Sequence, residues 1–167
     1  MRIISRLGTV FDCAIVIMAR LSDVILMFLM LSVCADVILR YFFNRPQAWI
    51  VEISEYLLLY ITFLGAAWVL KNEGHVIIDI LVARVSPTTR ATFGIISSVI
   101  GTFVCLVVFW FGAAETLDIF KRGVAVPSVL EFPKGPLVAI IPFGSFFLMI
   151  QFIRRTFGFM RSFRVSR

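Results

Sequence analysis

Acidic side chains and a single histidine are the residues of this chain best suited to chemistry. Glu52 and Glu55 are three residues apart and would share one face of a helix. A carboxylate pair of this kind could serve a proton-coupled site. His75 and Asp79 are four apart and could offer two ligands to a metal ion. These two pairs are therefore the first candidates for a functional site.

A metal centre or haem does not fit the residue inventory. A zinc site typically takes three or four protein ligands, whereas the chain has one histidine and three scattered cysteines. Haem held by paired histidines and the His-Glu-x-x-His motif of zinc peptidases are excluded for the same reason. We expect no cofactor and no catalytic site, with His75 and Asp79 in a structural turn after Gly74.

The composition requires that these residues be positioned by membrane helices. Of the 167 residues, 60% are hydrophobic and 16% are charged, and the mean hydropathy is +1.01. A soluble domain has roughly 45 to 50% apolar residues. The net charge of +6 comes from Lys and Arg that lie between and after apolar runs, which does not favour nucleic-acid binding.

Four apolar segments are long enough to cross a bilayer, whose core needs about 20 helical residues. They cover residues 21–39, 50–70, 93–114 and 137–153. The sequence predicts an all-α integral membrane protein with four transmembrane helices in a single domain, residues 1–167. An amphipathic helix over Met1–Arg20 would lie on the membrane surface, and a short interfacial helix would cover residues 76–85. The composition of residues 115–136 predicts an irregular loop.

The distribution of Lys and Arg predicts the orientation. With both termini in the cytoplasm, eleven of the sixteen basic residues lie on that side, and Arg40, Arg45, Lys121, Arg122 and Lys134 lie on the other. Cytoplasmic loops of membrane proteins carry an excess of Lys and Arg, so this distribution favours termini in the cytoplasm. We expect a multi-pass protein of a bacterial inner membrane, with residues 41–49 and 115–136 in the periplasm.

Polar residues near the start of the second span suggest contact with another protein. Glu52 and Glu55 could stabilise the helix N-terminus. They could equally bind arginines of a neighbouring subunit, or Arg40 and Arg45. Trp49 fits an interfacial anchor.

Two further side chains, Tyr56 and Tyr60, continue the face of Glu52 and favour protein contact over lipid contact. Asp36 lies four residues before Arg40, which predicts an ion pair.

Small residues mark two helix surfaces for close packing. Ser97, Gly101 and Cys105 recur every four residues in the third span, and Gly65, Ala66 and Ala67 follow each other in the second. Small residues let membrane helices approach closely. The pattern does not separate packing within the chain from packing against another subunit.

Several motifs together resemble the small membrane subunit of tripartite ATP-independent periplasmic (TRAP) transporters. They are Arg40-Tyr41-Phe42-Phe43-Asn44, Trp49-x2-Glu52-x2-Glu55, Phe63-Leu64-Gly65-Ala66-Ala67, Gly74-His75-x3-Asp79, and the segment from Pro136-Leu137 to Pro142-Phe143-Gly144. The four-span layout and the length agree with this family.

The resemblance implies a complex with a large polytopic membrane subunit and a periplasmic solute-binding protein. Transport of organic acids would be secondary and driven by sodium, with the substrate and sodium sites in the large subunit. This chain would then be a scaffold without enzyme activity that helps to dock the binding protein. Its candidate subunit contacts are Arg40, Trp49, Glu52, Glu55, Tyr56, Gly65, His75 and Asp79.

Two alternatives remain open from the sequence. The chain could assemble with itself into a four-helix exporter that uses Glu52 or Glu55 as a proton-coupled site. It could also anchor a redox complex in the membrane, although the solitary His75 disfavours haem ligation by this chain alone.

Overall fold

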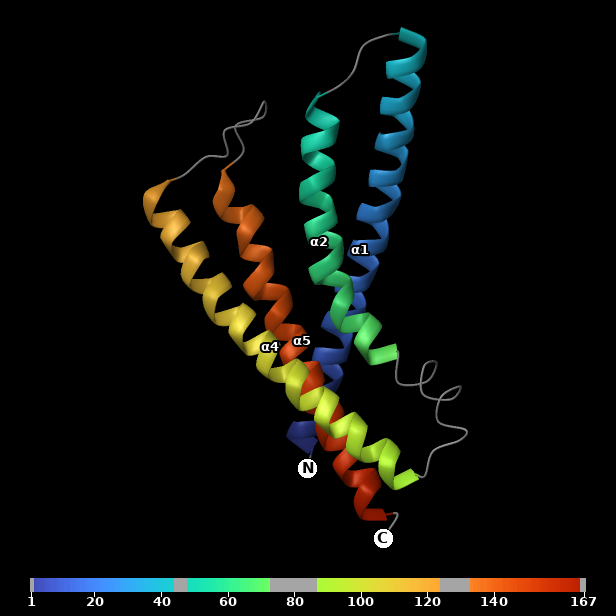
Figure 1. Cartoon of the computed structure of the whole chain (residues 1–167), viewed down its shortest axis with the longest axis vertical. Helices are drawn as coiled ribbons and strands as arrows, with labels where there is room; N and C mark the ends of the chain where they lie inside the picture. The colour runs from blue at the N-terminus through green and yellow to red at the C-terminus, as the bar shows by residue number, and fades with distance from the viewer. Residues whose placement is uncertain (1, 44–47, 73–86, 124–132, 166–167) are drawn as a thin grey trace.

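The computed structural model describes residues 2–43, 48–72, 87–123 and 133–165, and the structural statements below refer to these. They form four long helices, α1 (Arg2–Phe43), α2 (Ala48–Asn72), α4 (Pro87–Arg122) and α5 (Lys134–Val165) (Figure 1). Each helix contains one predicted span and is long and apolar enough to cross a membrane. The all-α fold with four membrane helices is therefore confirmed.

The helices form two pairs that meet at one end of the molecule. Figure 1 shows α1 beside α2 and α4 beside α5, with the pairs converging near both chain termini and diverging toward the opposite end. Successive helices alternate in direction, so the N- and C-terminal residues lie at the same end. An even number of crossings with both termini on one side follows from this arrangement.

The first helix differs from the expectation of a separate amphipathic helix over Met1–Arg20. Helix α1 runs through this region without a break, and the segment contains no proline. Its apolar residues Ile15, Met18 and Ala19 are buried, with 0, 6 and 7% of their surface exposed. These side chains pack within the protein, so the pattern that suggested a surface helix belongs to the start of a packed helix.

Helix α4 also extends beyond the expected start of the periplasmic loop at Glu115. Residues 115–122 contain no Gly or Pro, and Asp118 and Arg122 form an ion pair of 2.9 Å across one turn. The helix ends at Gly123, whose φ of 60° suits glycine and whose N–H donates to the Ile119 carbonyl at 3.0 Å. The predicted interfacial helix, residues 76–85, lies outside the described residues.

The α4–α5 pair is built from small residues of α4 that receive aromatic side chains of α5. A Cβ at Gly101 would lie 2.6 Å from the Phe152 ring, and one at Gly94 would lie 2.8 Å from the Phe159 ring. Ser98 is fully buried, whereas Ser97, which the four-residue pattern favoured, is exposed. A strict step of four drifts by about 40° per step around a helix, so alternating steps of four and three keep to one face.

A central core joins α1, α2 and α5. Met18, Leu64 and Ile140 are buried against one another, one from each helix. The backbones of α2 and α5 approach so closely that a Cβ at Gly144 would lie 2.6 Å from the Phe63 Cβ. This approach fixes α5 against α2 and thereby holds the two helix pairs together.

Candidate functional site: exposed membrane carboxylates and a polar junction

The residues at the start of α2 take different environments. Trp49 is 41% exposed and Glu55 is exposed, while Glu52 and Tyr56 are partly buried. Glu52 therefore faces partly toward the protein interior, whereas Glu55 faces outward and is available to another molecule. Helix α2 begins at the end opposite the chain termini (Figure 1).

Arg40 forms the ion pair that its spacing predicts. Its Nη2 donates to Oδ2 of Asp36, one turn earlier in α1. The Asp36 side chain is 9% exposed and that of Arg40 is 52% exposed. The guanidinium therefore remains accessible on one side while it neutralises a buried carboxylate.

Gly65, a predicted subunit contact, and Tyr60 both contact other helices of this chain. A Cβ at Gly65 would lie 3.4 Å from Ser22 Oγ, so this glycine faces α1. The Tyr60 hydroxyl donates to the Pro136 carbonyl at 2.9 Å, which places Tyr60 beside the start of α5. His75 and Asp79 lie outside the described residues.

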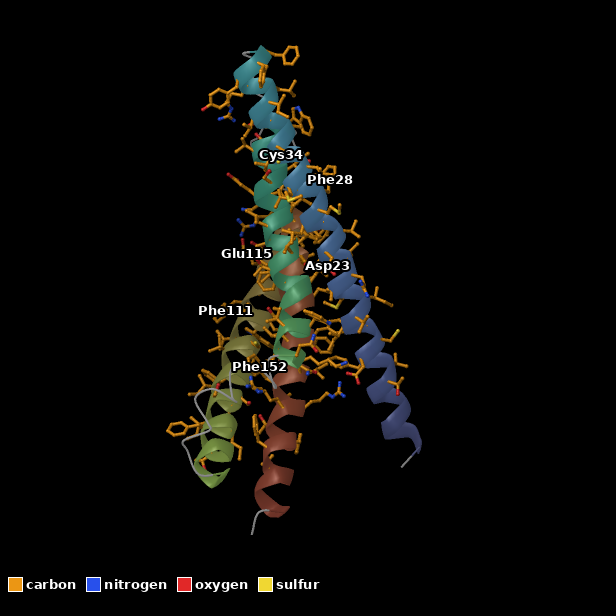
Figure 2. All side chains as sticks on the ribbon, turned by 90° about the vertical axis from the view of Figure 1, so that its right-hand side faces the viewer. Asp23, Phe28, Cys34, Phe111, Glu115 and Phe152 are labelled. Atoms are coloured by element: carbon orange, nitrogen blue, oxygen red, sulfur yellow. The ribbon has the colours of Figure 1, made fainter. Side chains whose placement is uncertain are left out.

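Asp23 lies near one end of the predicted span of residues 21–39, whereas the structure places it as an exposed carboxylate about midway along α1 (Figure 2). Its neighbour Ser22 donates to the carbonyl of Ile61, which is near the middle of α2. Exposed apolar side chains precede and follow it, among them Val16 at 43% and Met27 at 64%. A charged group at the centre of a bilayer costs about 2.5 to 3.5 kcal/mol on insertion scales, which makes Asp23 a functional candidate.

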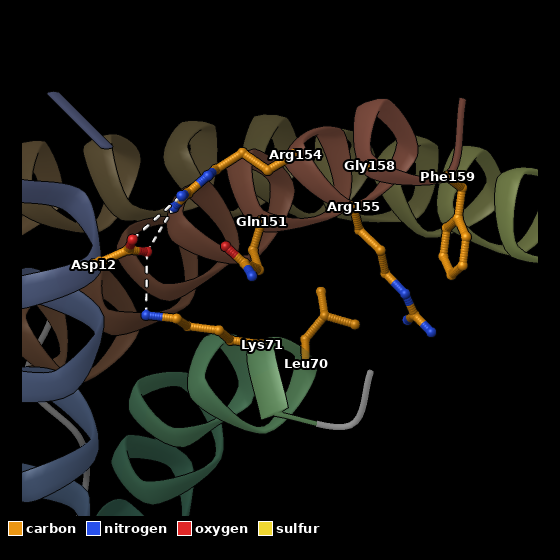
Figure 3. A pocket seen from close by; sticks show the side chains of 8 residues that line it. All are labelled: Asp12, Leu70, Lys71, Gln151, Arg154, Arg155, Gly158 and Phe159. Carbon is orange, nitrogen blue, oxygen red and sulfur yellow. Dashed lines mark hydrogen bonds and ion pairs between the residues drawn. The ribbon is translucent and has the colours of Figure 1, made fainter. Parts of the chain in front are cut away.

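A polar junction, defined here as Asp12, Lys71 and Arg154, links three helices near the termini. The Asp12 carboxylate lies 2.7 Å from Arg154 Nη1, 3.3 Å from Arg154 Nη2 and 3.2 Å from Lys71 Nζ (Figure 3). The Arg154 guanidinium also lies 5.3 Å from the centre of the Phe11 ring. One carboxylate of α1 therefore binds cations from both α2 and α5.

Sequence reasoning missed this junction because its members are far apart in the chain. Asp12 and Arg154 are separated by 142 positions, and no spacing rule relates them. The available signal was positional, since Lys71 directly follows the second predicted span and Arg154 directly follows the fourth. Charged residues that end spans on the same side of a membrane lie at a similar depth, so their side chains can meet.

The arrangement favours recognition and positioning over catalysis. Within the described ranges, no three His, Cys, Asp or Glu side chains gather as metal ligands. The polar groups that stand out are outward carboxylates and an ion-paired junction between helices. These features define a class of protein: a multi-pass helical membrane subunit whose polar side chains contact neighbours or hold helices together.

The comparison with known families confirms the resemblance found in the sequence. The family model for tripartite ATP-independent periplasmic transporters, DctQ component, matches residues 29–162. The chain belongs to this family and is a small permease component of a TRAP transporter, a membrane subunit and not an enzyme. It is accordingly a multi-pass protein of a bacterial inner membrane.

Curated relatives carry names of the same kind. The C4-dicarboxylate TRAP transporter small permease protein DctQ of Rhodobacter capsulatus is 27% identical over 114 residues, which are 68% of this chain and 50% of that protein. A protein of Haemophilus influenzae named as a TRAP transporter small permease protein is 27% identical over 120 residues, 70% of this chain and 74% of its own length. The chain thus spans half the length of the first relative.

Proposed function

We propose that this chain is the scaffold subunit of a sodium-driven, binding-protein-dependent transporter of organic acids. It binds a large polytopic membrane subunit that carries the substrate and sodium sites, and it helps to receive a periplasmic solute-binding protein. Family membership supports the complex, and the name of the Rhodobacter capsulatus relative supports organic acids as the cargo class.

The observation that carries the proposal is the outward carboxylate of Asp23 on a membrane helix. Asp23 lies on a stripe of exposed residues spaced by four and three positions along α1: Val16, Arg20, Asp23, Met27 and Met30. We call this set the outer stripe. Within the described part of the chain, Asp23 has no ion-pair partner. A cation of a neighbouring membrane helix would remove the cost of placing this charge in lipid.

The outer stripe also has the side chains of an adaptable helix contact. Met27 and Met30 are 64 and 58% exposed, and methionine fills irregular gaps against a partner helix. The steps of four and three along the outer stripe add up to a repeat of seven residues, as in the contact seams between packed helices. The large membrane subunit therefore meets α1 along this stripe, with an arginine or lysine opposite Asp23.

The far ends of α1 and α2 supply the second contact region. With both termini in the cytoplasm, Trp49, Glu55 and the accessible Arg40 face the periplasm. An exposed aromatic ring, a carboxylate and a guanidinium are suited to a protein surface, so this end is the one that receives the solute-binding protein. Glu52, partly buried beside them, stabilises the first turns of α2.

The proposal is tested by co-purification from a membrane that contains all three proteins. A tagged chain is expected to retain the large membrane subunit after detergent extraction. Asp23→Asn should lower the retained amount on the order of tenfold, because the partner cation is left unpaired in a desolvated interface. Asp118→Asn, which changes an exposed pair on α4, is the matched control and should retain the wild-type amount.

Two results would contradict the proposal. One is a tagged chain that purifies as a homodimer and leaves the large subunit behind, which is the outcome expected of a self-assembling exporter. The other is an Asp23→Asn chain that holds the large subunit as well as the Asp118→Asn chain does, which would remove the outer stripe from the interface.

A further inference from the structure

A cavity of about 410 Å³ that is largely open to solvent lies beside the polar junction, between α2 and α5 (Figure 3). Lys71 and Arg154 contribute to its wall from the junction, and Arg155 and Phe159 form the side farthest from Asp12. Its volume falls in the usual range of small-ligand sites, about 300 to 1,000 Å³.

The cavity has an excess of positive charge. Asp12 neutralises one of its three cations, so two positive charges remain among Lys71, Arg154 and Arg155. Among the residues that the structure describes, Arg155 has no carboxylate partner, and its guanidinium lies 5.6 Å from the centre of the Phe159 ring. Stacking of this kind orients the guanidinium while its N–H groups remain free to bind an anion.

A second polar group in the wall lacks a partner. Gln151 is only 9% exposed, and its Oε1 accepts no hydrogen bond. Figure 3 shows this side chain between Asp12 and Leu70, on the cavity side of α5. A buried amide oxygen without a donor costs about 1 to 3 kcal/mol. This oxygen is shielded from solvent, so a ligand in the cavity would bind Arg155 and leave Gln151 within the wall.

The position of the cavity indicates where such a ligand comes from. Lys71 follows the second predicted span, and Arg154 and Arg155 follow the fourth, so the cavity opens at the membrane boundary on the side of the chain termini. Leu70 and Phe159 add apolar surface beside the cations. Basic pockets between membrane helices on the cytoplasmic side suit the headgroups of anionic lipids.

We propose that this cavity binds the headgroup of an anionic phospholipid of the phosphatidylglycerol type. Arg155 binds the phosphate, and Lys71 and Arg154 supply the surrounding positive field. The bound lipid fills the space between α2 and α5 and thereby stabilises the end at which all helices converge. This site depends on the membrane setting and is independent of the transport role proposed above.

The test is native mass spectrometry of the full chain released from nanodiscs that contain equal amounts of phosphatidylglycerol and phosphatidylcholine. The wild-type chain is expected to retain one phosphatidylglycerol in preference to phosphatidylcholine. Arg155→Gln should reduce that retained lipid on the order of tenfold, and Arg155→Lys, which keeps the charge and loses the planar fork, should reduce it less. Arg122→Gln removes an arginine from the last turn of α4, which does not line the cavity, and should have no effect.

Further controls distinguish lipid binding from phosphate binding, and a binding defect from a folding defect. Inorganic phosphate at millimolar concentration should neither displace the lipid nor raise the melting temperature of lipid-free protein. Equal retention of the two lipids, unchanged retention by Arg155→Gln, or protection by phosphate alone would each overturn the proposal. If Arg155→Gln does not fold, Arg155→Lys replaces it, with a smaller loss of the preference for phosphatidylglycerol expected.

Discussion

Replacing Gly144 by alanine is expected to separate α2 from α5 and to destabilise the folded chain by about 1 to 3 kcal/mol. A Cβ at this position would lie 2.6 Å from the Phe63 Cβ and 2.7 Å from the Phe63 carbonyl oxygen. A backbone atom cannot rotate away, so one of the two helices must shift. The core of Met18, Leu64 and Ile140 lies on the same contact and would open with it.

Thermal unfolding in detergent, followed by size-exclusion chromatography, measures this effect. The melting temperature of Gly144→Ala should fall on the order of 5 °C. Gly158→Ala is the matched control on the same helix, because a Cβ there would meet no atom within 4 Å. Equal melting temperatures for the two variants would show that α2 and α5 do not pack as described.

Reversing the charge of Asp12 to lysine is expected to have the second large effect, a loss of about 2 to 3 kcal/mol. The carboxylate binds Lys71 and Arg154 together, so the variant would bring three cations to the place where α1, α2 and α5 meet. The side chains are about one third exposed, and solvent screening keeps the loss below that of a fully buried pair. Asp12→Asn, which removes the attraction without adding a charge, should cost about half as much.

Melting temperatures at low and high salt distinguish this mechanism from a packing defect. Salt should partly restore Asp12→Lys, because it screens repulsion between exposed charges. Asp118→Asn provides the control, since its pair with Arg122 lies within one helix and is more exposed, and its loss should be within about 0.5 kcal/mol. A stability of Asp12→Lys equal to that of Asp118→Asn would contradict a structural role for the junction.

Hydropathy was sufficient to predict the four helices, because a segment of about 20 apolar residues in a bilayer has few alternatives to a helix. It did not predict their ends. Helix α1 begins near the N-terminus and α4 runs to Arg122, since a helix can extend beyond the apolar segment until a residue such as Gly123 ends it. The ion pair of Asp36 and Arg40 was predictable because both residues lie on one helix.

For the contacts between helices, the sequence predicted the type of residue involved but not which individual residues make the contact. The sequence indicated small residues as packing surfaces, yet the choice of Ser98 over Ser97 depends on how α4 is rotated toward α5. The role of Asp12 depends on the relative height of three helices, which no local pattern encodes. Likewise, the predicted span of residues 21–39 puts Asp23 near one end, and its more central depth follows only from the contact of Ser22 with Ile61.

Reconstituted transport tests the central claim most directly. The chain, the large membrane subunit and the solute-binding protein would be combined in proteoliposomes with an inward sodium gradient and a radiolabelled C4-dicarboxylate or another organic acid. We predict uptake when all three proteins are present, none with this chain alone, and a strong loss when only this chain is omitted. Uptake by this chain alone, abolished by Glu52→Gln or Glu55→Gln, would contradict the account and identify a self-sufficient transporter.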